Sequence, residues 1–262
     1  YFTVLPLGGI QKRSGTRFVA EVNDSSTFSR LIPFQFNVDQ AFALEFSNKK
    51  VRMFADGGIL TASEHSVTVA NGDFSGGSTN WTDASNGTGS VTFETLDGVN
   101  VASLESNGGS DKAILRQAVT VPPGDGNTVL SLRFDTLLKA ATKSLSARIK
   151  VGTSAGGSDI LDRIFNSGSH LVDVDPGGAG TVHIDFEAAY ESTTTGVISV
   201  ANVAFLSAEP LEIDSPYTSS DVAFLNWTQS ADVLFLVHPT IAPHEFRRFG
   251  PAEFSLVQYD FQ

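Results

Sequence analysis

The stretch "SVTFETLDGVNVASLES", residues 90–106, decides the fold class of this chain. Two runs in which apolar and polar residues alternate flank Asp97-Gly98, a dipeptide that tolerates the positive φ angles of a two-residue hairpin turn. Alternation with a period of two is typical of strands that bury one face. The stretch therefore predicts an antiparallel β-hairpin.

The same period recurs on both sides of this hairpin. Upstream, the Phe-rich runs "RLIPFQFNV", "QAFALEF" and "KVRMFA" lie within residues 30–55 and predict an antiparallel meander. Downstream, alternating runs separated by Gly, Pro and Asp clusters fill residues 116–208, a spacing typical of a β-sandwich or jelly roll. One helical turn is expected within residues 215–227, where Ser219 or Ser220 could cap it. The chain is therefore predicted to be all-β.

Composition limits the classes of function. The chain has 262 residues, of which 41% are hydrophobic, which is enough for one large or two ordinary domains. A formal net charge of −12 repels nucleic acid and anionic membranes. No apolar run approaches the roughly 20 residues that span a bilayer, so no membrane contact is expected. The absence of Cys excludes thiolate metal sites and disulfides. The N-terminus lacks an initiator Met and a signal core, which suggests a fragment of a longer chain.

Composition also changes along the chain. Residues 71–200 carry most of the Gly, Ser, Thr and Asp, whereas the flanks on either side carry most of the Phe and Arg. We therefore expect a jelly-roll domain, residues 66–207, inserted into a smaller antiparallel β body formed by residues 1–65 and 208–262. These two parts are called the insert and the body below. Within the body, the strands "VRMFA" and "DVLFLVH" are expected to be neighbours, because an insertion is tolerated where its two ends emerge close together.

The stretch "NGDFSGGSTNWT", residues 71–82, admits three interpretations. A phosphate-binding loop would lead into a helix N-terminus or a Lys, but here the next periodic segment is a strand. An EF-hand loop would end in a Glu, which this stretch lacks. We therefore interpret it as the opening of a β-domain, with Phe74 and Trp81 packed in the core.

With "ILRQAVTVPPGDGNTVLSLRFDT" and "ISVANVAFL", this stretch resembles the jelly-roll carbohydrate-binding modules of the family 4 and 9 type over the whole insert. The resemblance implies a structural calcium near Asn71 and Asp73; the alternative for Asp73 is a turn hydrogen bond. It also implies sugar binding through exposed Trp or Tyr faces. Trp81 matches the buried framework Trp of the family, which leaves Tyr190 as the candidate sugar-binding residue.

The body resembles virion proteins of tailed phages. The resemblance lies in "VLPLGGIQKRSGTRFVAEV", "RLIPFQFNVDQAFALEFSNKKVRMFADGG" and "QSADVLFLVHPTIAPHEFRRFGPAEF", and the order of elements is similar to the tail tubular protein B, or nozzle, family of short-tailed phages. It implies a structural tail subunit of the virion, synthesised in the host cytoplasm, that joins other tail subunits in a homo-oligomeric ring. DNA contact is expected only if the chain lines a tail channel, and the insert could bind a host-surface glycan.

A glycoside hydrolase is the enzymatic alternative. The pairs Asp173 with Asp175 and Asp185 with Glu187 would point to one face of a strand, where two carboxyl groups could act as acid and base. In an acidic chain, the same pairs are also expected on ordinary strands that expose one face to solvent. We therefore expect no enzymatic activity, and a structural tail protein with a glycan-binding adhesin as the alternative.

Overall fold

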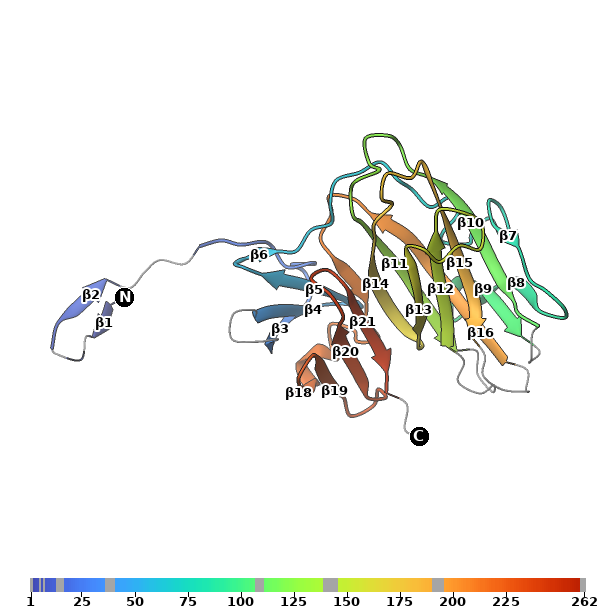
Figure 1. Cartoon of the computed structure of the whole chain (residues 1–262). Coiled ribbons are helices and arrows are strands. Elements are labelled where there is room, and N and C mark those ends of the chain that lie inside the picture. The colour runs from blue at the N-terminus through green and yellow to red at the C-terminus, as the bar shows by residue number, and fades with distance from the viewer. Residues whose placement is uncertain are drawn as a thin grey trace.

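The computed structural model describes residues 2–4, 6, 8–12, 17–35, 41–106, 111–138, 146–189 and 196–259. These residues form antiparallel strands and one short 3-10 helix, which confirms the all-β prediction (Figure 1). In the described part of the chain, we find no helix with the length and hydropathy that a membrane crossing requires.

The strands are β1 (Phe2–Val4), β2 (Ile10–Lys12), β3 (Arg30–Gln35), β4 (Ala41–Phe46), β5 (Lys50–Ala55), β6 (Gly58–Ile59), β7 (Thr82–Asp83), β8 (Ser90–Leu96), β9 (Val99–Ser106), β10 (Ile114–Thr120), β11 (Leu130–Leu138), β12 (Ser146–Gly152), β13 (Leu161–Phe165), β14 (Gly168–Val174), β15 (Thr181–Ala189), β16 (Gly196–Leu206), β17 (Glu212–Asp214), β18 (Asn226–Ser230), β19 (Val233–Val237), β20 (His244–Arg248) and β21 (Phe254–Gln258), and the 3-10 helix η1 spans Val222–Phe224.

The insert is a sandwich of two sheets. One is the five-stranded sheet β13-β12-β15-β10-β7, and the other is the β14-β11-β16-β9-β8 part of a nine-stranded sheet. Alternate residues of these strands share one hydrophobic core cluster, as the period of two predicted. Phe74 and Trp81 are both buried in this cluster with ring centroids 5.3 Å apart, so the prediction of their burial is confirmed.

The predicted hairpin is present as β8 and β9. Leu96 pairs with Val99, and the two turn residues between them, Asp97 and Gly98, have φ angles of 49° and 84°. Both angles lie in the left-handed region that a two-residue hairpin turn requires. The predicted meander is also present, since β3 pairs with β4 and β4 with β5.

The body has a second hydrophobic core cluster. It lies between the sheet β17-β5-β4-β3 and the strands β18 to β21, and its largest side chains include Phe34, Phe46, Phe246 and Phe254. The predicted pairing of "VRMFA" with "DVLFLVH" is wrong: β5 pairs with β4, β6 and β17, whereas β19 pairs with β18 and β20. The two strands instead contribute to the same core from opposite sheets, because alternation specifies a buried face and not the neighbouring strand.

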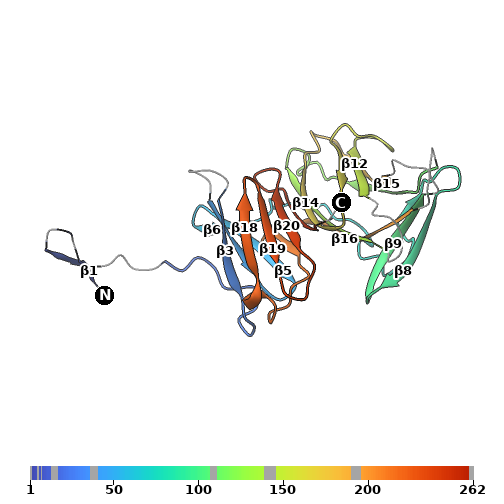
Figure 2. The same ribbon diagram turned by 90° about the horizontal axis from the view of Figure 1, so that it is seen from below.

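Insert and body are joined in two ways. The ends of the insert run antiparallel, with Ala62 N donating to Glu209 O at 2.9 Å and Ala208 N to Ser63 O at 3.3 Å. In addition, β21 of the body pairs with β14 of the insert, so one sheet of nine strands runs through both parts (Figure 2). The boundaries at residues 66 and 207 stay a prediction.

The predicted helical turn is present as η1, but the predicted caps are wrong. Asp221 occupies the N-cap position in place of Ser219 or Ser220. Its side chain does not cap η1; it accepts hydrogen bonds from Thr218 N at 2.8 Å and Thr218 Oγ1 at 2.6 Å. A local turn therefore competes for the side chain that would otherwise serve the helix end.

Candidate functional site

Asn71 holds the opening loop of the insert together. Its Nδ2 donates to Gly77 O and Thr79 O, both at 2.9 Å, and its Oδ1 accepts from Gly76 N at 2.8 Å. Its backbone oxygen accepts the indole N–H of Trp81 at 3.0 Å. The side-chain atoms of Asn71 therefore bind the loop, which places Trp81 in the core.

Asp73 makes the turn hydrogen bond that was the alternative to calcium. Its Oδ1 accepts from Ser75 N at 3.2 Å and from Ser75 Oγ at 3.0 Å. Within the described ranges, no group of three or more His, Cys, Asp or Glu side chains is placed to hold a metal ion. The calcium at Asn71 and Asp73 stays a prediction, and Tyr190, the predicted sugar-binding residue, lies outside the described residues.

Asp185 and Glu187 are buried and held in ion pairs. Asp185 accepts from Arg116 Nε at 2.7 Å and Nη2 at 2.6 Å. Glu187 pairs with Lys112 and, at 3.2 Å, with Lys150. Burial raises the pKa of Glu187, but its bonds to Lys112 and Lys150 outweigh burial and leave the pKa lowered. Both carboxyl groups are therefore bound to cationic side chains of the sheet, and the lowered pKa of Glu187 is opposite to the raised pKa that a general acid needs.

Asp173 and Asp175 do not share a strand face, because β14 ends before Asp175. Asp175 accepts from Gly177 N at 2.9 Å in the following turn. Burial and the nearby charge of Glu253 raise the pKa of Asp173 to about 6, against the effect of Arg163. The predicted placement of this pair on one strand face is therefore wrong.

A cavity of about 260 Å³ lies where the insert meets the body, and we call it the junction cavity. Strands β11, β14 and β16 of the insert form one side, and β17, β20 and β21 of the body contribute the other. It is lined by Val99, Asp135, Thr136, Leu137, Ser167, Gly168, Ser169, Asn202, Asp214, Ser215, Pro216, His244, Leu256 and Gln258. Sequence analysis missed this site because its residues come from distant segments that each look ordinary.

Two carboxyl groups meet in the junction cavity through one amide. Asn202 Nδ2 donates to Asp135 Oδ2 at 2.6 Å and to Asp214 Oδ2 at 3.4 Å. Asp135 is only 7% exposed. Ser169 lies close enough to lower its pKa, yet Asp135 Oδ1 accepts no hydrogen bond of acceptable geometry. The cavity wall therefore contains a buried carboxyl oxygen without a hydrogen-bond partner among the described residues.

A β-bulge places Asn202. The register between β11 and β16 shifts, since Arg133 pairs with Ala204 whereas Asp135 pairs with Ala201. Asn202 has a φ of 52°, a left-handed conformation that Asn adopts more readily than most residues. Bulges redirect side chains, and this one turns the amide toward both carboxyl groups.

The electrostatics of the junction cavity centre on Asp135. Burial is the main cause that raises its pKa to about 7, and the charge of Asp214 adds to it. Lys50 Nζ lies 2.5 Å from Asp214 Oδ1, so Lys50 forms an ion pair with Asp214. Burial lowers the pKa of His244, against the effect of its hydrogen bond to Ala242 O. The two carboxyl groups lie within hydrogen-bonding reach of each other, closer than the separation of about 5 Å or more that glycosidases use.

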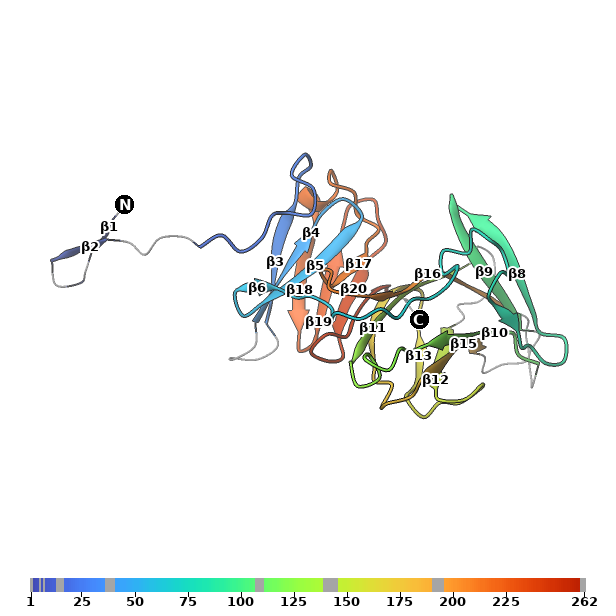
Figure 3. The ribbon, with the colours of Figure 1, turned by 90° about the horizontal axis from the view of Figure 1, so that it is seen from above.

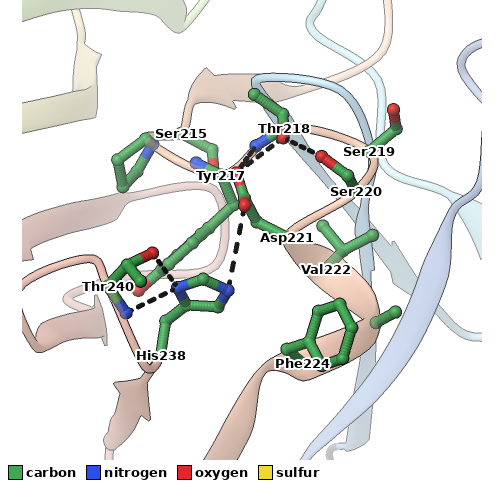
Figure 4. A network of polar contacts seen from close by, with 12 residues as sticks. Ser215, Tyr217, Thr218, Ser219, Ser220, Asp221, Val222, Phe224, His238 and Thr240 are labelled. Carbon is green, nitrogen blue, oxygen red and sulfur yellow. Dashed lines mark hydrogen bonds and ion pairs between the residues drawn. The ribbon is translucent and has the colours of Figure 1, made fainter.

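A polar network holds the wall of the junction cavity that follows Asp214. Asp221 binds Thr218, and its Oδ1 lies 3.8 Å from His238 Nε2 (Figure 4). His238 Nδ1 in turn accepts from Thr240 N at 3.3 Å. Tyr217 is fully buried beside this network, and its hydroxyl has no hydrogen-bond partner. The network therefore links the turn before η1 to the residues that follow β19.

No protein-family model and no curated protein sequence matches the chain. Solved structures with similarity include an enzymatically active domain of tailspike protein 4 from bacteriophage CBA120, with 19% identity and a TM-score of 0.40 over 52% of this chain and 21% of that one. TmCBM61, in complex with β-1,4-galactotriose, has 14% identity and a TM-score of 0.40 over 53% and 97% of the two chains. A family 11 carbohydrate-binding module of Clostridium thermocellum has 16% identity and a TM-score of 0.37 over 56% and 97%. At these scores the similarities carry no conclusion about function.

Proposed function

We propose that the chain is a glycan-binding module whose binding site is the junction cavity. The observation that carries the proposal is Asp135, a buried carboxyl group in the lining of the junction cavity, one of whose oxygens has no hydrogen-bond partner among the described residues. Sugar hydroxyl groups donate hydrogen bonds, and above pH 7 the ionised carboxylate of Asp135 is a stronger acceptor than a neutral group. Asn202 and the hydroxyl groups of Ser169 and Ser215 add donors and acceptors on the same lining.

The size and composition of the junction cavity define the ligand. Pockets for drug-sized molecules run from about 300 to 1,000 Å³, so a cavity of about 260 Å³ suits a single sugar ring. Among the described residues, its lining contains no Trp, Tyr or Phe. Binding would therefore depend on hydrogen bonds and not on the stacking of a sugar against an aromatic face.

The substitution Asp135→Asn tests the proposal. It keeps the shape of the side chain but removes the charge, so we expect glycan affinity to fall roughly 10- to 100-fold, the equivalent of about 1.5–3 kcal/mol for a hydrogen bond to a charged group. A glycan array with the full chain would identify a ligand, and calorimetry would compare the variant with the parent.

Asp97→Asn is the matched control. It removes one carboxylate from a hairpin turn whose left-handed backbone suits Asn, so affinity should not change. If Asp135→Asn and the parent bind glycan with equal affinity, the binding site lies outside the junction cavity. If no glycan on the array is bound, the proposed function is wrong.

A structural subunit of a phage tail is the second candidate function, and an apolar groove on the body favours it. The groove has a volume of about 640 Å³ and runs between residues 19–22 and the outer face of β3, β4 and β5. Leu31 in its lining is 65% exposed, and Phe54 and Ala43 lie on the same face. An apolar surface of this kind is typical of a protein–protein contact.

A second copy of the chain is the occupant that this candidate requires. The β1–β2 hairpin lies apart from the body, and we call residues 1–16 the N-terminal arm (Figure 3). The arm leaves the body at Arg17, whose Nη2 donates to Gly57 O at 2.6 Å, and Gly57 lines the groove. An arm that begins at one groove can reach the groove of a neighbour, and such head-to-tail contacts generate rings.

Deletion of residues 1–16 and the substitution Leu31→Asp test this assembly. Each is expected to shift the chain from oligomer to monomer in light scattering coupled to size exclusion. The deletion removes the arm, and the substitution places a charge in the apolar groove that the arm would occupy. Leu138→Asp, at an exposed position on the insert, should leave the oligomer intact. A parent chain that stays monomeric at its highest soluble concentration would exclude self-assembly through this groove.

A further inference from the structure

We propose that the contact between insert and body, which we call the seam, is a proton-sensitive joint. Two carboxyl pairs cross the seam, Asp135 with Asp214 and Asp173 with Glu253. The seam is tight when each pair holds a proton, and it loosens when both members of a pair are ionised. The inference concerns how the two parts of the chain are held together, and it does not depend on glycan binding.

The first pair joins β11 of the insert to β17 of the body. Asn202 Nδ2 donates to Asp135 Oδ2 at 2.6 Å and to Asp214 Oδ2 at 3.4 Å, so both carboxyl groups lie against one amide. Asp135 is buried, and one of its oxygens has no hydrogen-bond partner among the described residues. Two carboxylates this close repel each other, which favours a proton on one of them. A protonated Asp135 can donate to Asp214, and the repulsion then becomes a hydrogen bond across the seam.

The charged groups around this pair determine which member holds the proton. Lys50 Nζ lies 2.5 Å from Asp214 Oδ1, so Asp214 is the member with a cation against it. Lys50 also pairs with Glu212 at 3.3 Å, and Arg133 lies 3.7 Å from the same Glu212. Burial and the charge of Asp214 raise the pKa of Asp135 to about 7. Asp135 therefore holds the proton and releases it near neutral pH.

The second pair joins β14 of the insert to the residue that precedes β21 of the body. Asp173 N donates to Glu253 Oε1 at 3.2 Å, and Arg163 Nη2 lies 3.3 Å from Glu253 Oε2. Burial and the charge of Glu253 raise the pKa of Asp173 to about 6, against the effect of Arg163. The two pairs share one arrangement, because in each a carboxyl group of the insert gains a proton beside a carboxyl group of the body that pairs with a cation.

Two imidazole groups at the seam respond to pH in the opposite direction. His170 of β14 is fully buried, and its Nδ1 lies 2.9 Å from Ser255 Oγ of β21. Burial lowers the pKa of His170 to about 3, and it also lowers the pKa of His244 of β20, which lines the junction cavity. Such imidazoles make the fold less stable as pH falls below about 6.5, because only the unfolded chain gains the proton readily. The total stability of the parent therefore does not report the carboxyl pairs by itself.

The contribution of the carboxyl pairs to stability decreases as pH rises. Between the ordinary pKa of 3.8 and about 7, the folded chain holds a proton on Asp135 that the unfolded chain has released. This proton stabilises the fold at low pH, and the stabilisation is lost as pH rises through 7. For Asp173 the same loss lies between pH 3.8 and about 6. It is expected to be smaller, because Asp173 is only partly buried and solvent screens its charge.

Urea unfolding of Asp135→Asn and the parent at pH 5 and pH 8 tests the first pair. The amide of Asn can donate to Asp214 as the protonated carboxyl group does, but it cannot ionise. Relative to the parent, the equilibrium constant for unfolding of the variant should fall by about 10- to 100-fold between pH 5 and pH 8, since each pKa unit corresponds to a tenfold change. The comparison cancels the titration of His170 and His244, which both chains share. Asp97→Asn, at an exposed hairpin turn, is the matched control and should follow the parent at both pH values.

A distance measurement tests whether the seam itself responds to pH. Because the chain contains no Cys, the substitutions Leu138→Cys in the insert and Val237→Cys in the body provide specific sites for spin labels at exposed positions. The distribution of distances between the labels should be broader at pH 8 than at pH 5 in the labelled parent. In a labelled chain that also carries Asp135→Asn and Asp173→Asn, the distribution should be the same at both pH values.

Two results would overturn the inference. One is a difference in stability between Asp135→Asn and the parent that is equal at pH 5 and pH 8, and the other is a distance distribution in the labelled parent that does not change with pH. If Asp135→Asn fails to fold, nuclear magnetic resonance titration of the carboxyl carbons of the parent decides. An ordinary pKa near 3.8 for Asp135 then overturns the inference, and a pKa near 7 supports it. The failure of glycan binding on the array would reject the proposed function and leave these results unaffected.

Discussion

Replacing Trp81 with Ala is expected to lower the free energy of unfolding of the insert by about 3–5 kcal/mol, the cost typical of removing a large buried aromatic side chain. Trp81 is 6% exposed and packs against Phe74 and Phe186, with ring centroids 5.3 and 6.0 Å away. Its indole N–H also binds Asn71 O, so the substitution removes a link between the core and the opening loop. Urea unfolding followed by circular dichroism would measure the change.

Trp227→Ala is the matched control for this prediction. Trp227 is 36% exposed, and its ring stacks under the guanidinium of Arg30 at 4.7 Å. Exposed cation–π pairs contribute about 0.5–1 kcal/mol, so this variant should lose much less stability. Equal unfolding midpoints for Trp81→Ala and the parent would show that the insert does not depend on this core residue.

Arg116→Ala is expected to be nearly as destabilising, at about 3–5 kcal/mol, because it leaves the carboxylate of Asp185 buried without its cation. Asp185 is 1% exposed, and both of its oxygens accept from Arg116. The expected loss reflects the uncompensated charge and not the strength of the ion pair. The double substitution of Arg116→Met with Asp185→Leu should therefore recover most of the stability, because it removes both charges.

Arg148→Ala provides a comparison on the same sheet. Arg148 also forms two bonds to one carboxylate, at 2.7 Å each to Asp162, but the two side chains are 36% and 34% exposed. Water replaces a lost partner at such a position, so we expect a cost of about 0–1 kcal/mol. Denaturant unfolding of both variants would show whether the loss of stability depends on the burial of the carboxylate or on the geometry of its two hydrogen bonds. Equal losses in the two variants would contradict the role assigned to burial.

Local patterns in the sequence were sufficient for the strands and for part of the core. The hairpin of β8 and β9 needs only alternation and the turn dipeptide Asp97-Gly98, all of which lie within one short segment. The burial of Trp81 likewise follows from its place in an opening loop that leads into an alternating run. Such features are predictable because they depend on backbone geometry and on contacts between residues close in the chain.

The partners of those strands, and the site between the two parts of the chain, depend on tertiary structure. β14 pairs with β21, and β5 and β19 lie in different sheets. All of these strands show the same alternation, so alternation alone does not predict which of them pair. The sequence also cannot show the environment of a carboxyl group: Asp185 is bound by Arg116, whereas Asp135 lies buried in the lining of the junction cavity beside Asp214. A period of two determines which face a strand buries. The segment that covers that face is determined only when distant parts of the chain pack together. The charges and the solvent around each side chain therefore depend on the tertiary structure.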